Sequence, residues 1–295
     1  MPSESSVERE LIVKASAQAV AERYVFAAQG EALAAHLSEW WTSHGTASAE
    51  NLDDFVTELT SVMRAHTPDR HLAVRPVHVF PRRSLPPSAM GVRQVAILDG
   101  NIGLIEISGF GAPVGAFPVL DAAMLMIAST TALILDVRQH RGGDSDTEAY
   151  FAGYFCREPT LINTFHGRDE AFSRQQWSAA HVHGPQYLDR QVVILTSEVT
   201  GSGGESFAYF MQATGQATLV GDITSGAAHP GLFFPVHEQY QVFVPTGRPE
   251  SGITGGNWEG VGVTPTRRVP ADEALAEARC WLGTVPGTID NVVSS

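Results

Sequence analysis

Apolar residues recur at three- and four-residue spacing through the first quarter of the chain. The spacing is clear in VAERYVFAAQGEALAAHLSEWW and again in NLDDFVTELTSVMRAH, and it is the period of helices that bury one face. Ser48 or Asn51 can cap the second helix, and Pro68 ends it because proline lacks the N–H that a helix uses. HLAVRPVHVF then alternates like a strand. We therefore expect a helical N-terminal subdomain over residues 1–78.

The pattern changes after the proline-rich stretch PRRSLPPSAMG, which we interpret as a connection between domains. Beyond it, VAIL, IGLIEI, ALILDV, VVILTS and ATLVG predict strands, and PVLDAAMLMIAS, DTEAYFAGYFC and SFAYFMQAT predict helices. Continuous apolar strands separated by helices are typical of α/β layers with both sheet faces buried. LFFPV and YQVFVPT add strands, and ADEALAEARCWL predicts a final helix. The expected class is α/β, with the core over residues 79–295.

Charge and targeting features narrow the possible partners. The net charge is -13, and no basic stripe is visible, which argues against a nucleic-acid partner. The N-terminus has no apolar core of the kind that a signal peptide needs, and no run of about 18 apolar residues occurs. We expect a cytoplasmic protein that does not bind membranes.

Two residue types limit the chemistry. Cys156 and Cys280 lie far apart and lack the spacing of a disulfide framework or a zinc site, so we expect both to be buried apolar side chains. Lys14 is the single lysine among the 19 basic residues, and it belongs to the helical N-terminal region. A mechanism that needs a lysine base is therefore disfavoured.

Ser202 stands among glycines in LTSEVTGSGGESFAYF, where a predicted strand turns into a helix. A serine hydroxyl needs a base to attack, and the resulting oxyanion needs donors such as the N–H groups at a helix N-terminus. The N–H of Gly203 can be one of them. The run from Ser202 to Glu205 also has the S-x-x-E form of a capping box, in which the serine only caps the helix. Ser197 and Ser206 are weaker candidates.

A second glycine turn, in LDVRQHRGGD, follows a predicted buried strand. Ligands of α/β proteins bind at the carboxyl ends of the strands, so the N–H of Gly142 or Gly143 can complete an oxyanion site. The alternative is an ordinary turn flanked by a structural ion pair between Asp136 and Arg138.

Histidine supplies the base in most serine hydrolases. Residue type alone cannot choose among the eleven histidines, of which four lie near predicted loop or strand ends: His71, His140, His229 and His237. His183 in HVHGP lacks a third metal ligand, so we expect neither a metal site nor a cofactor. Glu259, in the loop TGGNWEGVG, can orient a histidine or be a solvated charge.

Taken in order, these segments resemble the C-terminal processing (tail-specific) peptidase family, in the branch with the tricorn core protease and the repeats of interphotoreceptor retinoid-binding protein. The similar segments are the helical region ending in DRHL, IGLIEISGF, LILDVRQHRGG, the block around TGSGGES, and TGGNWEGVGVTPTRRVPADEAL. They cover nearly the whole chain. The resemblance implies a core of the ClpP/crotonase-like β-β-α spiral type, with no PDZ domain interrupting residues 76–95.

The same resemblance implies a serine-type endopeptidase that acts on peptides or proteins and needs no cofactor. Ser202 is its nucleophile, and the oxyanion donors are Gly203 with the Gly142 and Gly143 turn. The position of the family's catalytic lysine falls on Ala227, so a serine/lysine dyad is not expected. The tricorn branch uses histidine, serine and glutamate instead, roles that map onto His71, Ser202 and Glu259, with His229 as the alternative base.

Two departures from the family pattern stand near the expected site. Gly203 and Gly204 replace an alanine/serine pair, and His140 and Arg141 stand where the family tends to have asparagine and glycine. An alternative function follows from the retinoid-binding-protein repeats, namely non-catalytic binding of a hydrophobic ligand such as a retinoid or fatty acid. Self-association into a homo-oligomer is compatible with both functions.

Overall fold

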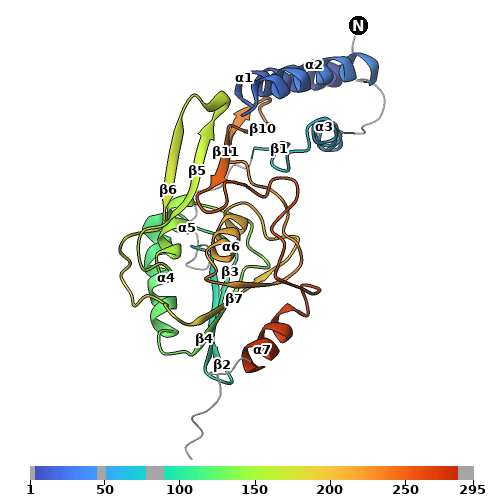
Figure 1. Cartoon of the computed structure of the whole chain (residues 1–295). Coiled ribbons are helices and arrows are strands. Elements are labelled where there is room, and N and C mark those ends of the chain that lie inside the picture. The colour runs from blue at the N-terminus through green and yellow to red at the C-terminus, as the bar shows by residue number, and fades with distance from the viewer. Residues whose placement is uncertain (1–3, 45–50, 78–89, 285–295) are drawn as a thin grey trace, which may run out of the picture. The chain divides into compact units, whose positions relative to one another are not determined.

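The computed structural model describes residues 4–44, 51–77 and 90–284, and the chain divides into two compact units (Figure 1). The first unit combines residues 1–83 with the later segments 165–174 and 227–250, and the second unit holds the remainder. The predicted boundary between residues 78 and 79 lies outside the described residues. So do Ser48 and most of the proline-rich connection.

The first unit packs helices on a small antiparallel sheet. Its helices are α1 (Glu4–Arg23), α2 (Ala27–His44) and α3 (Leu52–His66), and its sheet has the order β1 (Ala73–Pro76), β10 (Tyr240–Pro245), β9 (Gly231–Pro235). One apolar cluster joins the helices to β10 through side chains such as Ile12, Leu59 and Val242, each fully buried. The helical N-terminal region predicted from the spacing of apolar residues is confirmed.

Specific residues determine both ends of helix α3. The Asn51 side chain accepts a hydrogen bond from the N–H of Asp54 at 2.9 Å, which satisfies one of the free donors of the first turn. The helix ends at His66, just before Thr67 and Pro68. The predicted cap at Asn51 and the predicted stop are both confirmed.

Replacing Asn51 with alanine is expected to lower the free energy of unfolding by about 1 kcal/mol, because the N–H of Asp54 loses its acceptor. Urea unfolding followed by circular dichroism measures this loss. Asn51→Ser, which keeps an acceptor oxygen, is the matched control and should recover most of the stability. Equal stability of the alanine and serine variants would show that the cap contributes nothing.

The second unit is built on a six-stranded sheet with the order β12-β8-β7-β4-β3-β2. Strands β3, β4, β7, β8 and β12 run parallel, and β2 is antiparallel to β3. The strands are β2 (Val92–Leu98), β3 (Ile102–Ile107), β4 (Ala132–Asp136), β7 (Gln191–Thr196), β8 (Thr218–Gly221) and β12 (Arg267–Arg268). The helices are α4 (Pro113–Met126), α5 (Ser145–Ala152), α6 (Gly203–Ala213) and α7 (Ala274–Thr284).

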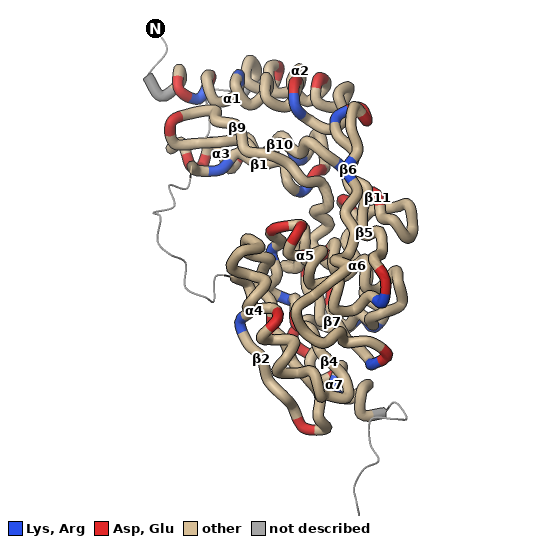
Figure 2. Tube along the Cα trace, turned by 90° about the vertical axis from the view of Figure 1, so that its left-hand side faces the viewer, with Lys and Arg blue, Asp and Glu red and all other residues tan. Residues whose placement is uncertain are grey.

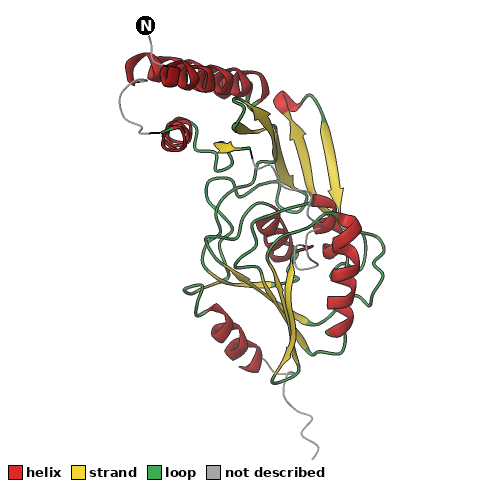
Figure 3. Ribbon diagram, turned by 180° about the vertical axis from the view of Figure 1, so that it is seen from behind, coloured by secondary structure: helices red, strands yellow, loops and turns green. Residues whose placement is uncertain are grey.

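Helices cover both faces of this sheet (Figure 3). Ala132 and Ile134 of β4 pack in one apolar cluster with Ala278 of α7. On β3, a β-carbon added to Gly103 would meet Ile127, directly after α4, at 3.0 Å. Successive residues of a strand point to opposite faces, so α7 covers one face and α4 the other. The predicted α/β class with strands buried on both faces is confirmed.

Several boundaries differ from the sequence predictions. Helix α4 starts at Pro113, five residues before the predicted Pro118, because proline is tolerated in a first turn and Pro118 is accommodated inside the helix. A third sheet, in the order β11-β5-β6, was not predicted, and the residues of its strands are divided between the two units. These strands are β5 (Leu161–Gly167), β6 (Ser173–Trp177) and β11 (Gly247–Ser251), with a 3-10 turn at Arg168–Glu170. They are rich in polar residues, which hides the alternation of a strand.

Surface features agree in part with the composition. Figure 2 shows acidic and basic residues interspersed along the described trace, with no continuous basic stripe in it. Among the described helices, none is long and apolar enough to cross a membrane. Cys156 is buried as predicted, whereas Cys280 is exposed. The prediction for Cys280 is wrong because this residue faces away from the stripe of α7 that buries Ala274, Ala278 and Leu282.

Candidate active site

Ser202 lies at the junction between the turn that follows β7 and the first residue of α6. Its backbone has φ 54° and ψ −122°, a conformation that residues with a β-carbon rarely adopt and that is found at functional turns. A sharp turn from strand to helix is how many hydrolases present a nucleophilic serine. The start of α6 also places partly positive N–H groups beside this residue.

The capping interpretation of Ser202 is realised through its backbone. Ser202 and Glu205 form a capping box, in which the Glu205 carboxylate accepts the Ser202 N–H at 2.9 Å. The carbonyl of Ser202 accepts from the N–H groups of Glu205 and Ser206, both at 2.9 Å. These bonds to the Ser202 backbone cap the helix independently of the hydroxyl.

Glu205 organises the loop around Ser202. Its side chain is completely buried, and besides the Ser202 N–H it accepts hydrogen bonds from the Thr224 hydroxyl at 2.5 Å, the Ser225 hydroxyl at 3.1 Å and the Gly226 N–H at 2.6 Å. Four donors on one carboxylate hold the residues after β8 against the start of α6. A buried charge is tolerated when it is hydrogen-bonded in this way.

Glu205→Gln is expected to lower the free energy of unfolding by about 2–4 kcal/mol, because one amide NH2 would face donors and leave them unpaired in the interior. The measurement is urea unfolding. Glu198→Gln is the matched control, since Glu198 is an exposed carboxylate between β7 and Ser202, and its stability should change by less than about 0.5 kcal/mol. Equal losses for the two variants would contradict this role of Glu205.

The Gly142 turn lies directly against Ser202. A β-carbon on Gly142 would lie 2.7 Å from Cβ and 3.1 Å from Oγ of Ser202, and Gly142 has φ +102°. Only glycine suits that conformation and that close approach. The turn is fixed by Phe110, whose N–H donates to the Gly142 carbonyl at 3.0 Å. The two glycine segments predicted as parts of one site are thus brought together, because β4 and β7 are adjacent parallel strands.

The N–H groups around Ser202 are not equivalent. The N–H of Gly142 donates to Nδ1 of His140 at 3.1 Å, so it is already engaged. The N–H groups of Gly143 and Gly203 donate no hydrogen bond to any residue in the described ranges. A β-carbon on Gly203 would lie 3.6 Å from the Gly143 nitrogen, so both free donors border the same space.

The buried His140 side chain stabilises the glycine turn by accepting a hydrogen bond from it. It is fully buried against the Phe110 ring, with the ring centroids 4.4 Å apart. Burial lowers the pKa of His140 to about 3, so the imidazole is neutral near pH 7. Because Nδ1 accepts the Gly142 N–H, the proton resides on Nε2. His140 therefore acts as a structural acceptor, and a β-carbon on Gly204 would clash with its Nδ1 at 2.5 Å.

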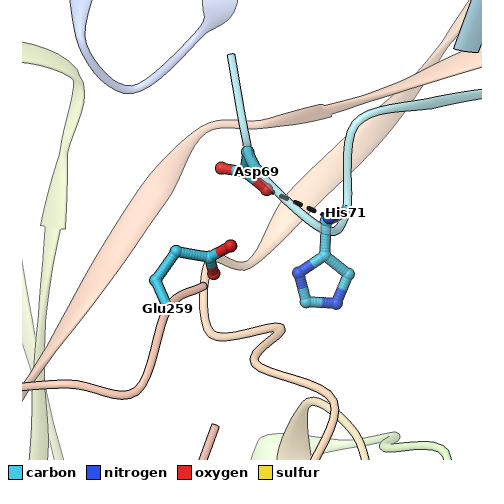
Figure 4. Close-up of side chains that lie close together, drawn as sticks. All are labelled: Asp69, His71 and Glu259. Atoms are coloured by element: carbon cyan, nitrogen blue, oxygen red, sulfur yellow. Dashed lines mark hydrogen bonds between the residues drawn. The ribbon is translucent and has the colours of Figure 1, made fainter. Parts of the chain in front are cut away.

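In the first unit, the two candidate bases, His71 and His229, both contact Asp69, a buried residue that is 3% exposed. One Asp69 oxygen accepts the backbone N–H of His71 at 3.0 Å (Figure 4). The other lies 2.7 Å from Nδ1 of His229 and 3.1 Å from the Tyr24 hydroxyl. Asp69 thus fixes the His229 ring directly and the His71 segment through its backbone.

The His71 imidazole is held in its neutral form. Burial lowers its pKa to about 4, with the Asp69 charge opposing this shift and His229 adding to it. Nδ1 of His71 is buried and has no hydrogen-bond partner among the described residues. A neutral ring nitrogen without a partner can accept a proton, as a general base must.

Glu259 lies in the second unit, in the loop between β11 and β12, and is half-buried. Its N–H donates to the Asn257 side chain at 3.0 Å, and the neighbouring Gly260 N–H donates to the Gly226 carbonyl at 2.8 Å. Trp258 anchors this loop on α6 through Tyr209, with ring centroids 5.3 Å apart. The loop is therefore tied to the same segment that Glu205 holds.

Sequence reasoning missed three residues that shape these sites. Asp69 could have been suspected because it stands two residues before His71 in DRH. Glu148 shares the spacing of the buried Phe151, Ala152 and Phe155, so a carboxylate on that apolar face was the available signal. The structural role of His140 had no signal, because it depends on the path of the turn.

Comparison with known families agrees with the order of these segments. The model of peptidase family S41 matches residues 101–269, which include Ser202, Glu259 and the glycine turn. The model of the N-terminal domain of peptidase S41 in eukaryotic IRBP matches residues 7–98. Together they span both the helical N-terminal region and the sheet core.

Solved structures share the fold at low sequence identity. A candidate peptidase from Parabacteroides merdae has a TM-score of 0.69 and 18% identity, over 97% of this chain and 98% of its own. The photosystem II D1 C-terminal processing protease has a TM-score of 0.59 and 11% identity, over 95% and 98%. The tricorn protease has the same score and identity, over 91% of this chain and 35% of its own.

Proposed function

The chain belongs to peptidase family S41, a family of serine peptidases, and on this basis we propose that it hydrolyses peptide bonds with Ser202 as the nucleophile. The single observation that carries the proposal is the strained Ser202 turn at the start of α6, with the free N–H groups of Gly143 and Gly203 beside it. The substrates are peptides or proteins, as the family implies. The reaction is an endopeptidase reaction through an acyl-enzyme.

In this mechanism His71 takes the proton from the Ser202 hydroxyl as Oγ attacks the carbonyl carbon of the substrate. The N–H groups of Gly143 and Gly203 stabilise the oxyanion that forms. His71 then protonates the leaving amine, and water hydrolyses the acyl-enzyme by the reverse use of the same base. Glu259 supports the base, directly or through another group. Of the two turn glycines we assign Gly143, because the Gly142 N–H is bound to His140.

A histidine base is favoured over the lysine of the tail-specific enzymes. Ala227 stands at the expected lysine position, and Lys14 on α1 is the chain's single lysine. His71 is the first choice because its ring is neutral with Nδ1 unpaired. His229 is the alternative, because Asp69 orients its Nδ1 as the aspartate of a catalytic triad orients its histidine.

The test is covalent labelling with a fluorophosphonate probe, followed by mass spectrometry of the digested protein. We expect one adduct, carried by the peptide that contains Ser202. An adduct on another serine, or no adduct at any pH between 5 and 9, would refute the proposal.

The ligand-binding alternative rests on one observation, the match of residues 7–98 to the IRBP-type N-terminal domain. It predicts saturable binding of retinol or long-chain fatty acids, measured by fluorescence titration. Absence of binding at micromolar concentrations would remove it. A cytoplasmic location and self-association also stay predictions, which cell fractionation and sedimentation would test.

A further inference from the structure

Glu148 is a buried carboxyl group beside the proposed oxyanion site. It lies on α5, which begins just after the Gly143 turn, and it is 2% exposed. A β-carbon on Gly203 would lie 3.6 Å from the Gly143 nitrogen and 3.8 Å from Oε2 of Glu148. The space in front of Gly203 is therefore bordered both by a free N–H donor and by this carboxyl group.

The groups that contact the Glu148 carboxyl are uncharged. The Gln176 amide lies 3.4 Å from Oε2, and the Ser206 hydroxyl is the other polar group that favours the charged form of this carboxyl group. Asn163 donates to the Ser206 hydroxyl at 2.8 Å and to the Gln176 carbonyl at 3.2 Å, which orients both toward Glu148. Oε1 is buried and has no partner within the described residues.

No basic side chain of the described residues compensates a charge on Glu148. The titratable groups nearby in the chain are His140, which is neutral, the exposed Arg141, which does not contribute to the pKa of Glu148, and Asp144 and Asp146 at the start of α5, which carry the same sign. Burial without a cation favours the neutral form of a carboxyl group. It raises the pKa of Glu148 to about 7, against the opposing hydrogen bonds from Ser206 and Gln176.

We propose that Glu148 acts as a neutral carboxylic acid beside the oxyanion, and that its ionisation slows attack by Ser202. The inference rests on the proposed function. A carboxylate here would repel the charge that develops on the substrate oxygen, and such a repulsion in a protein interior slows the reaction on the order of 100-fold. The acid form brings no charge, and its O–H can donate a hydrogen bond, as protonated carboxyl groups do in other oxyanion sites.

The experiment measures the rate constant for fluorophosphonate labelling of Ser202 between pH 5.5 and 9. For the wild-type protein we expect the rate to fall at least tenfold as the pH rises through about 7, because Glu148 ionises. Glu148→Gln should keep its rate up to pH 9. Glu198→Gln removes an exposed carboxylate of the same unit and should decline like the wild type.

A second variant covers the case in which Glu148→Gln does not fold. Ser206→Ala removes a hydroxyl that lowers the pKa of Glu148, so the decline should move to higher pH. A decline that is identical in the wild type and Glu148→Gln, or that does not move in Ser206→Ala, overturns this inference while Ser202 labelling still supports the peptidase. Absence of Ser202 labelling in the wild type overturns both proposals.

Discussion

Replacing Ser202 with alanine is expected to abolish covalent labelling by a fluorophosphonate and to abolish peptide hydrolysis. The loss should be complete within detection, because the probe phosphorus bonds to the Ser202 oxygen itself. The fold should survive, since Glu205 holds the turn through the backbone N–H of Ser202. Labelling is read from gel fluorescence, and folding from circular dichroism.

The matched control for this variant is Ser129→Ala. Ser129 is an exposed serine of the same unit, between α4 and β4. Ser129 precedes β4, whereas Ser202 follows β7, the parallel neighbour of β4. The two serines therefore lie at opposite ends of the strands. Full labelling of Ser129→Ala is expected. Labelling that persists in Ser202→Ala would assign the probe reaction to another residue and end the nucleophile assignment.

The sheet core of this protein could be predicted because its central strands consist almost entirely of apolar residues, which indicates burial on both faces. ALILD and VVILT are apolar on both faces, and both became central parallel strands. By contrast, SRQQW of β6 exposes all but one of its residues, so neither alternation nor a continuous apolar run marks it. Strands of this kind are fixed by pairing with distant segments, which local periodicity does not reveal.

In the candidate site, too, features that depend on local sequence could be predicted, and features that depend on the three-dimensional path of the chain could not. Ser202 and the Gly142 turn were predictable, because a strand followed by small residues and a helix is a local pattern. The engagement of the Gly142 N–H by His140 was not, because it depends on how the turn folds back on its own histidine. The Asp69 contact with His229 joins residues 160 positions apart, and no spacing rule reaches that far.

The two buried glutamates of the second unit, Glu148 and Glu205, differ in the hydrogen-bond donors around them. Glu205 accepts four hydrogen bonds, two of them from backbone N–H groups, which suits a carboxylate. Glu148 receives only side-chain contacts and leaves one oxygen unpaired, which suits the neutral acid. The residue type is the same in both places, and the donors around it decide the charge.

Replacing His71 with alanine is expected to lower the rate constant for Ser202 labelling by about 10³-fold, within the range that a general base contributes. The imidazole must be neutral to accept the Ser202 proton, and burial lowers the pKa of His71 to about 4. The wild-type rate should therefore rise as the pH increases through about 4, before it falls again when Glu148 ionises near pH 7. In His71→Ala this rise should disappear.

Comparison with His229→Ala separates the two candidate bases. His229 donates to buried Asp69, so its loss leaves a carboxylate short of a donor and should cost about 1–3 kcal/mol of stability. Nδ1 of His71 makes no such bond in the described residues, so His71→Ala should unfold like the wild type. His66→Ala, an exposed histidine of the same unit, controls for the loss of an imidazole. If a folded His229→Ala lost labelling while His71→Ala kept it, the base would be His229, and the pH rise near 4 would have to come from another group.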